Sequence, residues 1–358
     1  MLNIYNIYNI YNMNWLLSSF ISNFSFAFQS LISYKLSSVN NYNTLALNTS
    51  THAAYLILSF IFSFLIYFID PKSVNNLLYS IVFLFKNFNI TILFYALLSL
   101  LGNSILYFAY SKGKQLDNIN PGIASTLSNF SLIISIALPY YFYNMKINSK
   151  NLTGIIIYLF SVFLLSHTNS KTKETNKNSN SKNITKEGFN NKEKQNNKKY
   201  FEWIFLCLLS ALSYGLAAFT SYTIIHKHKN INKNSLTLSL FIYEVLIGLT
   251  IYLFFTFDNN KNYNNGFFKN HNKDLRELLT NIKNLPFVFG SAIFNATGLI
   301  SLYNGYANSP NPGFVDATSN LYTTTQSLLN WAMFNTPLNN TQIIGLILAS
   351  ISIFLMNL

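Results

Sequence analysis

Long apolar stretches separated by short polar breaks run along almost the whole chain. A helix needs roughly 17–25 mainly apolar residues to cross about 30 Å of hydrocarbon. Stretches of about this length predict ten membrane-spanning helices, and the expected fold is an all-α integral membrane protein of the multi-pass kind. The expected spans are 13–34, 52–69, 89–110, 121–143, 151–167, 201–225, 235–257, 285–307, 312–334 and 341–358.

The segments between these spans fall into three kinds. Residues 1–12, MLNIYNIYNIYN, form a low-complexity repeat without the basic region of a signal peptide. Residues 77–88 are apolar but too short to span, which leaves either an interfacial segment or an extension of the third helix. Residues 168–200 are rich in Lys and Asn and carry few apolar side chains, so they predict a disordered linker at the midpoint. A second polar loop is expected over 258–283.

Composition agrees with a membrane protein. Half of the residues are hydrophobic and only 10% are charged, whereas a soluble domain carries about 25% charged residues. The net charge of +13 would suit nucleic acid, but the lysines crowd into connecting segments and Arg276 is the only arginine. Bidentate guanidinium contacts, which commonly read phosphates and bases, are therefore scarce. We expect a lipid bilayer as the partner and no nucleic acid.

Cysteine and histidine give no sign of a metal or cofactor site. Cys207 is the only cysteine, so an intrachain disulfide and a cysteine-rich metal site are both excluded. The five histidines show no HExxH spacing. We expect no metal, no cofactor and no catalytic residue.

The two halves of the chain resemble one another. A shift of 188 places Trp15 on Trp203, and a shift of 191 places the NPG block at 120–122 on that at 311–313, with Ser-Asn pairs following at 128–129 and 319–320. The repeats predicted from this match are residues 13–167 and 201–358. Each holds five spans, an odd number, so the second copy would enter the membrane from the opposite side. Inverted repeats of this kind are a common architecture of secondary transporters.

Ten spans in two five-helix halves, with NPG at the start of spans four and nine, resemble the drug/metabolite transporter superfamily and its EamA-like domains. The residues that carry this resemblance are LFYALLSLLGNSILYFAYSKG, NPGIASTLSNF and NLTGIIIYLFSVFLL, with their counterparts in the second half. The resemblance implies a transporter of small metabolites that works by alternating access.

Polar residues within the predicted spans are the candidate substrate-binding residues. Asp316 begins a polar stripe on span nine, which continues through Asn320, Thr323, Thr324 and Ser327 at helical spacing. Such a stripe predicts either the lining of a cavity or hydrogen bonding between helices. The candidates from the other spans are Ser125, Asn129, Asn103, Asn295 and Asn304.

Two acids lie within predicted spans, Glu244 and Asp316. A charged group in hydrocarbon costs roughly 2.5–3.5 kcal/mol on insertion scales, so each is a functional hypothesis. Desolvation favours the protonated form of a buried carboxyl, which makes both residues candidates for proton coupling.

No span centre carries Lys or Arg, and a phosphorylated substrate would need such a cation. A neutral, zwitterionic or cationic small molecule is therefore favoured. The alternatives are a lipid-handling membrane protein and a non-transporting scaffold of the same fold. A second copy of the chain, forming a homodimer, is also left open as a partner.

Overall fold

Every regular element in the described part of this computed structural model is a helix. The structure describes residues 2–166, 186–257, 268–309 and 312–356, except the single positions 118, 146, 148, 229, 230 and 269. The first half comprises α1 (Leu2–Tyr34), a π-helical turn η1 (Lys35–Val39), α2 (Thr44–Tyr67), α3 (Pro71–Asp117), α4 (Pro121–Ser128), α5 (Ser131–Tyr143) and α6 (Ser149–Ser166). The second comprises α7 (Lys186–Lys227), α8 (Lys233–Phe257), α9 (His271–Thr280), α10 (Leu285–Asn308), α11 (Pro312–Ser319), α12 (Tyr322–Phe334) and α13 (Asn340–Met356).

The length and composition of the helices identify a membrane-embedded protein. Among the described residues, seven helical segments are long and apolar enough to cross a bilayer: α1 with η1, α2, α3, α4 with α5, α7, α8 and α10. Helices α6 and α13 contain shorter apolar segments, Leu152–Leu165 and Asn340–Leu355. The expected ninth span is interrupted between α11 and α12. The number of ten spans therefore stays a prediction.

Three helices in the first half are longer than the sequence pattern indicated. Helix α1 begins at Leu2, within the low-complexity segment, rather than at residue 13. Helix α2 begins at Thr44 rather than at residue 52, because the Asn43 side chain accepts the backbone N–H groups of Leu45 and Ala46, both at 3.0 Å. An asparagine N-cap of this kind fixes the helix start. The apolar segment 77–88 is an extension of α3, and Phe88 marks a kink with φ −130° and ψ 16°.

Two expected polar segments contain helix. Helix α7 begins at Lys186, inside the predicted linker, while residues 167–185 lie outside the described part of the chain. Its first turns are rich in Lys, Glu and Gln, which favour helix, and contain no proline. Helix α9 lies in the expected loop 258–283, where it buries Leu275 and Leu278 and packs on α2. Residues 258–267 lie outside the described part.

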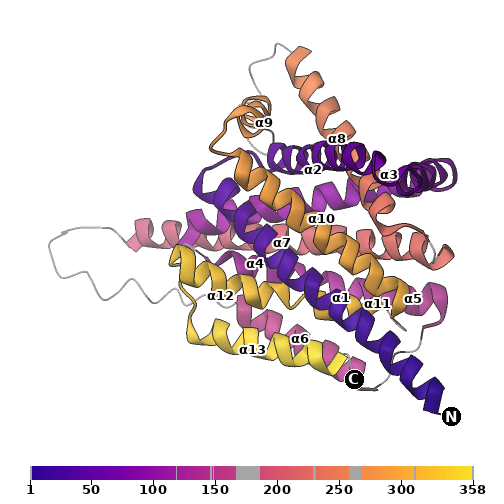
Figure 1. Ribbon diagram of the computed structural model, residues 1–358. Helices are drawn as coiled ribbons and strands as arrows, with labels where there is room; N and C mark the ends of the chain where they lie inside the picture. Colours follow the sequence, from indigo (N-terminus) through magenta and orange to yellow (C-terminus); the bar gives the residue numbers. More distant parts are fainter. Residues whose placement is uncertain are drawn as a thin grey trace.

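The main helix pairs each join one helix of the first half to one helix of the second half. Helix α1 packs along α10, and their counterparts α7 and α3 pack together in the same way (Figure 1). Counterparts also contact each other directly, α2 with α8 and α6 with α13, while α4 packs on α12 and α5 on α11. Both termini lie at one end of the helical bundle and α7 begins at the other end (Figure 1).

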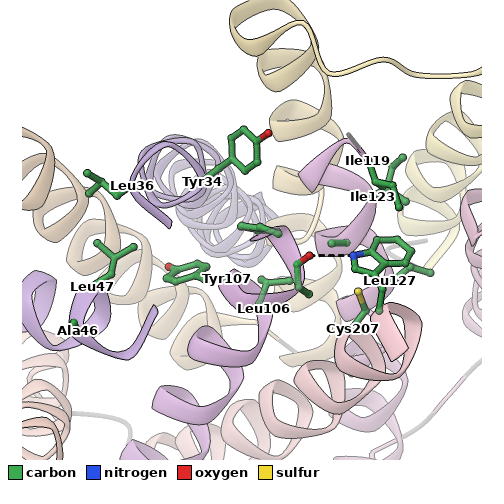
Figure 2. Packing of buried hydrophobic residues seen from close by; sticks show 14 of the residues in the cluster. Tyr34, Leu36, Ala46, Leu47, Leu106, Tyr107, Ile119, Ile123, Leu127 and Cys207 are labelled. Atoms are coloured by element: carbon green, nitrogen blue, oxygen red, sulfur yellow. Dashed lines mark hydrogen bonds between the residues drawn. The ribbon is translucent and has the colours of Figure 1, made fainter. Parts of the chain in front are cut away.

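Small residues let the paired helices approach closely. A Cβ on Gly102 of α3 would lie 3.1 Å from Tyr214 Cδ1 of α7, and a Cβ on Gly298 of α10 would lie 2.6 Å from Phe26 Cε1 of α1. Phe26 and Tyr214 are themselves equivalent at the shift of 188, so one contact is built twice. The core beside these contacts is apolar, with Leu127 of α4 beside Cys207 of α7 (Figure 2).

Candidate functional site

Two broken helices cross near the middle of the bundle. Helix α4 ends at Ser128, and a tight turn follows in which the Phe130 N–H donates to the Leu127 carbonyl at 3.2 Å. Helix α11 ends at Ser319, with an equivalent bond from the Leu321 N–H to the Thr318 carbonyl at 3.3 Å. Such i→i+3 bonds are 3₁₀ geometry, and a 3₁₀ stretch inside a helix often marks a functional site. Both breaks fall on the repeated Ser-Asn pair.

The two breaks are bound to each other. The Asn129 amide donates to the Asn320 carbonyl at 3.0 Å and to Thr323 Oγ1 at 3.3 Å. The Asn23 amide of α1 donates to the Thr318 carbonyl at 3.3 Å. Carbonyls freed at a helix end need partners of this kind, so the two asparagine side chains stabilise the break between α11 and α12.

The first NPG block forms the start of α4. The Asn120 side chain accepts the Gly122 N–H at 2.9 Å, and Pro121 occupies the first turn. The Asn120 amide also donates to the Ser327 carbonyl of α12 at 3.0 Å. A Cβ on Gly122 would lie 2.6 Å from the Ser327 Cα, so only glycine permits this crossing. Asn311 of the second block lies outside the described residues.

A polar cavity lies between the broken helices and the helices that pack around them. Its volume is about 140 Å³, which is room for on the order of ten waters or a small metabolite. Its walls come from both halves, α1, α3 and α5 on one side of the sequence and α7, α10, α11 and α12 on the other. Six aromatic rings line it: Phe26, Tyr95, Tyr107, Tyr214, Tyr306 and Tyr322.

Among the described residues that line this cavity, Asp316 is the only carboxyl, and none is Lys, Arg or His. The side chain is 8% exposed, and the Tyr306 hydroxyl donates to its Oδ1. The Ser135 hydroxyl of α5 also lies near this carboxyl, while it donates its proton to the Leu132 carbonyl at 3.1 Å. The electrostatic character of the cavity is therefore set by one acid surrounded by neutral donors and aromatic rings.

Five of the sequence-predicted residues line the cavity, namely Asp316, Asn320, Asn129, Asn295 and Asn103. The remaining candidates do not line it: Ser125, Thr323, Thr324, Ser327, Asn304 and Glu244. Ser125 is buried against Tyr110 at 2.5 Å and Gln326 at 2.7 Å, and Thr323 binds Asn129. The Thr324 hydroxyl faces Ser350 of α13 at 3.2 Å, because the break at 320–321 interrupts the helical register on which the predicted stripe depended. Asn304 also lies off the cavity lining.

Glu244, which also lies off the cavity lining, forms a buried pair that the sequence did not reveal. Its Oε2 lies 2.6 Å from His52 Nδ1, and both side chains are 0% exposed. His52 Nε2 lies 3.0 Å from the Asn295 amide nitrogen, and Asn295 lines the cavity. A Cβ on Gly248, one turn from Glu244, would lie 2.9 Å from the Thr49 Cβ, so this glycine allows α2 and α8 to meet here. A histidine within an apolar run was the available signal.

Comparisons with known proteins leave the family of this chain open. No family model matches it, and no curated protein matches it. One solved structure, described only as a crystal structure of a protein, aligns over 95% of both chains with a TM-score of 0.48 and 10% sequence identity. A likeness this distant says nothing about substrate or activity.

Proposed function

We propose that the chain is a multi-pass membrane transporter that moves a small metabolite by alternating access, rather than an enzyme. The proposed architecture is ten spans in two inverted five-helix units, residues 13–167 and 201–358, which is the arrangement of the EamA-like drug/metabolite transporters that the sequence resembles. In inverted repeats, substrate sites lie near the bilayer midplane and are built from discontinuous helices.

The observation that carries this proposal is the cavity between the two broken helices. Both halves contribute to its walls, and the breaks occur at equivalent positions, Asn129 and Asn320. Two further observations support it. The pairing of α1 with α10 and of α3 with α7 exchanges the halves. The termini and the start of α7 lie at opposite ends of the bundle (Figure 1), as an odd number of crossings in the first half requires.

The chemistry of the cavity favours a neutral, zwitterionic or cationic substrate. Asp316 offers a negative charge, and the surrounding tyrosine rings attract cations through their faces. A phosphorylated substrate would meet a carboxylate without any compensating cation. We include proton coupling in the proposal, with Asp316 and Glu244 as the coupling candidates, because both acids are buried.

The test is uptake into proteoliposomes across a panel of amino acids, polyamines, neutral metabolites and sugar phosphates, with and without a pH gradient. We expect uptake of at least one of the first three groups and none of the sugar phosphates. A hydrogen bond to a charged group is worth about 1.5–3 kcal/mol, so Asp316→Asn should lower uptake of a cationic substrate about tenfold or more.

Asp316→Asn should also weaken the pH dependence of uptake, because it removes one of the two buried acids, while membrane insertion stays intact. Asn304→Ala is the matched control, since Asn304 lies within α10 but off the cavity lining. Uptake unchanged by Asp316→Asn would contradict the assignment of this cavity.

Lipid handling is a second candidate, and one observation favours it. A groove of about 690 Å³ runs between the N-terminal part of α3 and helices α2, α8 and α10. Its walls combine apolar side chains such as Phe62 and Ile293 with polar ones such as Asn76 and Asn234, as a lipid with its headgroup would need. Movement of fluorescent phospholipid between leaflets of the same vesicles, without solute uptake, would favour this function over transport.

A further inference from the structure

The His52–Glu244 pair lies beside the cavity and is not part of its lining. Both side chains are fully buried, and neither Glu244 oxygen accepts a well-aligned hydrogen bond from any described residue. Burying an ion pair costs several kcal/mol per ion unless further hydrogen bonds satisfy it. Stability alone therefore gives no reason for a histidine and a glutamate here, since two apolar side chains would pack at lower cost.

The charge of the His52–Glu244 pair changes through the gain or loss of a proton, because the side chains around it are tyrosines and other aromatic residues. Besides His52, four described tyrosines lie close enough to interact with the charge of Glu244: Tyr95 and Tyr107 of α3, Tyr214 of α7 and Tyr303 of α10. Phe241 of α8 stacks on the His52 ring with centroids 4.3 Å apart, and Tyr55 of α2 packs on Phe241 in turn. No lysine or arginine belongs to this set.

Asn295 connects the pair to the cavity through one hydrogen bond. A side-chain amide donates through its nitrogen and accepts through its oxygen, and a neutral imidazole has one nitrogen of each kind. With the Asn295 nitrogen facing Nε2, as here, Nε2 accepts and the ring proton lies on Nδ1, facing Glu244. A proton added to Nε2 turns that atom into a donor, and Asn295 must then present its oxygen to it.

We propose that His52 and Glu244 form a proton-binding site, and that the side chain of Asn295 transmits its protonation state to the cavity. The proton adds to His52 Nε2, and the net charge of the pair rises from −1 to 0 with no other bond made or broken. Without this proton, Asn295 presents its oxygen to the cavity. With it, Asn295 presents its NH₂ group, so proton binding disfavours a solute held there through its own N–H donors. This inference deepens the proposed function and rests on it, because it assigns the coupling step of the same transporter.

The test follows the rings themselves by NMR of the full chain in lipid nanodiscs, with ¹⁵N-labelled histidine and asparagine. The variant His52→Phe/Glu244→Gln assigns the His52 signals by their loss, and it keeps the stacking on Phe241. We expect His52 to change from the Nδ1–H form to the doubly protonated form as the pH is lowered, and the Asn295 amide to shift with the same midpoint.

Two further variants separate the parts of the proposal. Glu244→Gln removes the negative neighbour, and the proton affinity of His52 should fall about tenfold or more, since an opposite charge at this distance is worth 1–3 pK units. Asn295→Ala should leave His52 titrating. A wild-type His52 that stays in one form throughout, or an Asn295 signal that does not follow it, overturns the inference. Because none of these readouts needs a substrate, they are independent of the uptake assay: absent uptake with a titrating His52 would remove the transporter proposal and leave the proton site.

Discussion

The two halves of the molecule bury the same tyrosine at the same place but give it different partners. In the first half Tyr110 binds Ser125, which binds Gln326 of the second half. In the second half Tyr306 binds Asp316, whose other neighbour is Ser135 of the first half. Ser125 and Asp316 are equivalent at the shift of 191, and so are Ser135 and Gln326. One arrangement has therefore been built twice, once without a charge and once around an acid.

The difference shows how a repeated fold divides its tasks. The cluster around Ser125 consists of neutral groups that satisfy one another and lies off the cavity lining, so its role is to hold α4 against α12. Asp316 occupies the same position in the other half but lines the cavity. A buried carboxyl is costly without partners, and the hydroxyl of Tyr306 offsets part of that cost while leaving the acid available to a solute.

The largest expected effect comes from removing the equivalent hydroxyls. Tyr306→Phe takes a donor from the carboxyl in the cavity, and uptake should change about tenfold or more, because hydrogen bonds to charged groups contribute about 1.5–3 kcal/mol. Tyr110→Phe leaves Ser125 bonded to Gln326, so it should lower thermal stability by about 1 kcal/mol and change uptake little. Uptake rates and melting of the two purified variants test this, and equal losses of uptake would show that the halves are not specialised.

The asparagines at the two breaks should differ in the same way. The Asn129 amide holds the Asn320 carbonyl and Thr323 Oγ1, so Asn129→Ala should destabilise the protein by about 1–3 kcal/mol through the unsatisfied groups it leaves. For Asn320 the bonding group is the backbone carbonyl, which Asn320→Ala retains. That variant should melt close to wild type and act on uptake, since its side chain lines the cavity. If Asn320→Ala melted at a lower temperature than Asn129→Ala, the assignment of the Asn129 side chain as the group that joins the two breaks would be contradicted.

Much of the fold follows from the sequence, and particular residues explain why. The apolar runs place the helices, and the cap at Asn120 follows from the N-P-G pattern, since asparagine accepts orphan N–H groups and proline needs no donor there. The kink at Phe88 and the breaks at Asn129 and Asn320 do not follow, because partners distant in sequence stabilise them. Asn129, for example, is held by residues of the other half.

The sequence predicts a residue of the candidate site only where that residue type is unusual in its sequence surroundings. Asp316 is an acid in an apolar run, and its cost in hydrocarbon identifies it. Neither His52 nor Glu244 indicates this pair by itself. The packing of α2 on α8 brings the two side chains within 2.6 Å of each other. That contact depends on Gly248, whose spacing from Thr49 only the packed helices reveal. The face of Thr324 could not be predicted either, because the period of an unbroken helix does not hold across the turn at 320–321.

Substitution of the equivalent glycines Gly102 and Gly298 gives a smaller test of the structural equivalence of the two halves. Gly298→Ala places a Cβ 2.6 Å from Phe26 Cε1, whereas the same change at Gly102 gives 3.1 Å to Tyr214 Cδ1. Overpacking typically costs 1–3 kcal/mol, and replacing glycine in the unfolded chain returns roughly 0.4–1 kcal/mol. We expect Gly298→Ala to lose about 1 kcal/mol net and Gly102→Ala less. Gly290→Ala is the control in the same helix as Gly298, since its Cβ meets only Ile32 at 3.5 Å. A loss at Gly290 as large as at Gly298 would contradict the close contact.

The smallest effect concerns α9, for which the first half has no counterpart between α2 and α3. Burial lowers the pKa of His271 below its usual 6.5, so the neutral ring is favoured where α9 is docked on α2. The contribution of His271 to docking is therefore complete above pH 6.5 and is lost as the pH falls through the lowered pKa.

Hydrogen exchange of the α9 amides, corrected for the intrinsic effect of pH, measures this docking. We expect protection to fall on mild acidification in the wild type and to stay level in His271→Gln. Asp274 on the same helix acts in the opposite sense, because burial raises its pKa and docking then gains from its protonation. The pH dependence of α9 protection is assigned to His271 only if His271→Gln abolishes it. A slope that persists in His271→Gln would assign the pH response to another group and leave α9 as an element whose docking does not depend on this histidine.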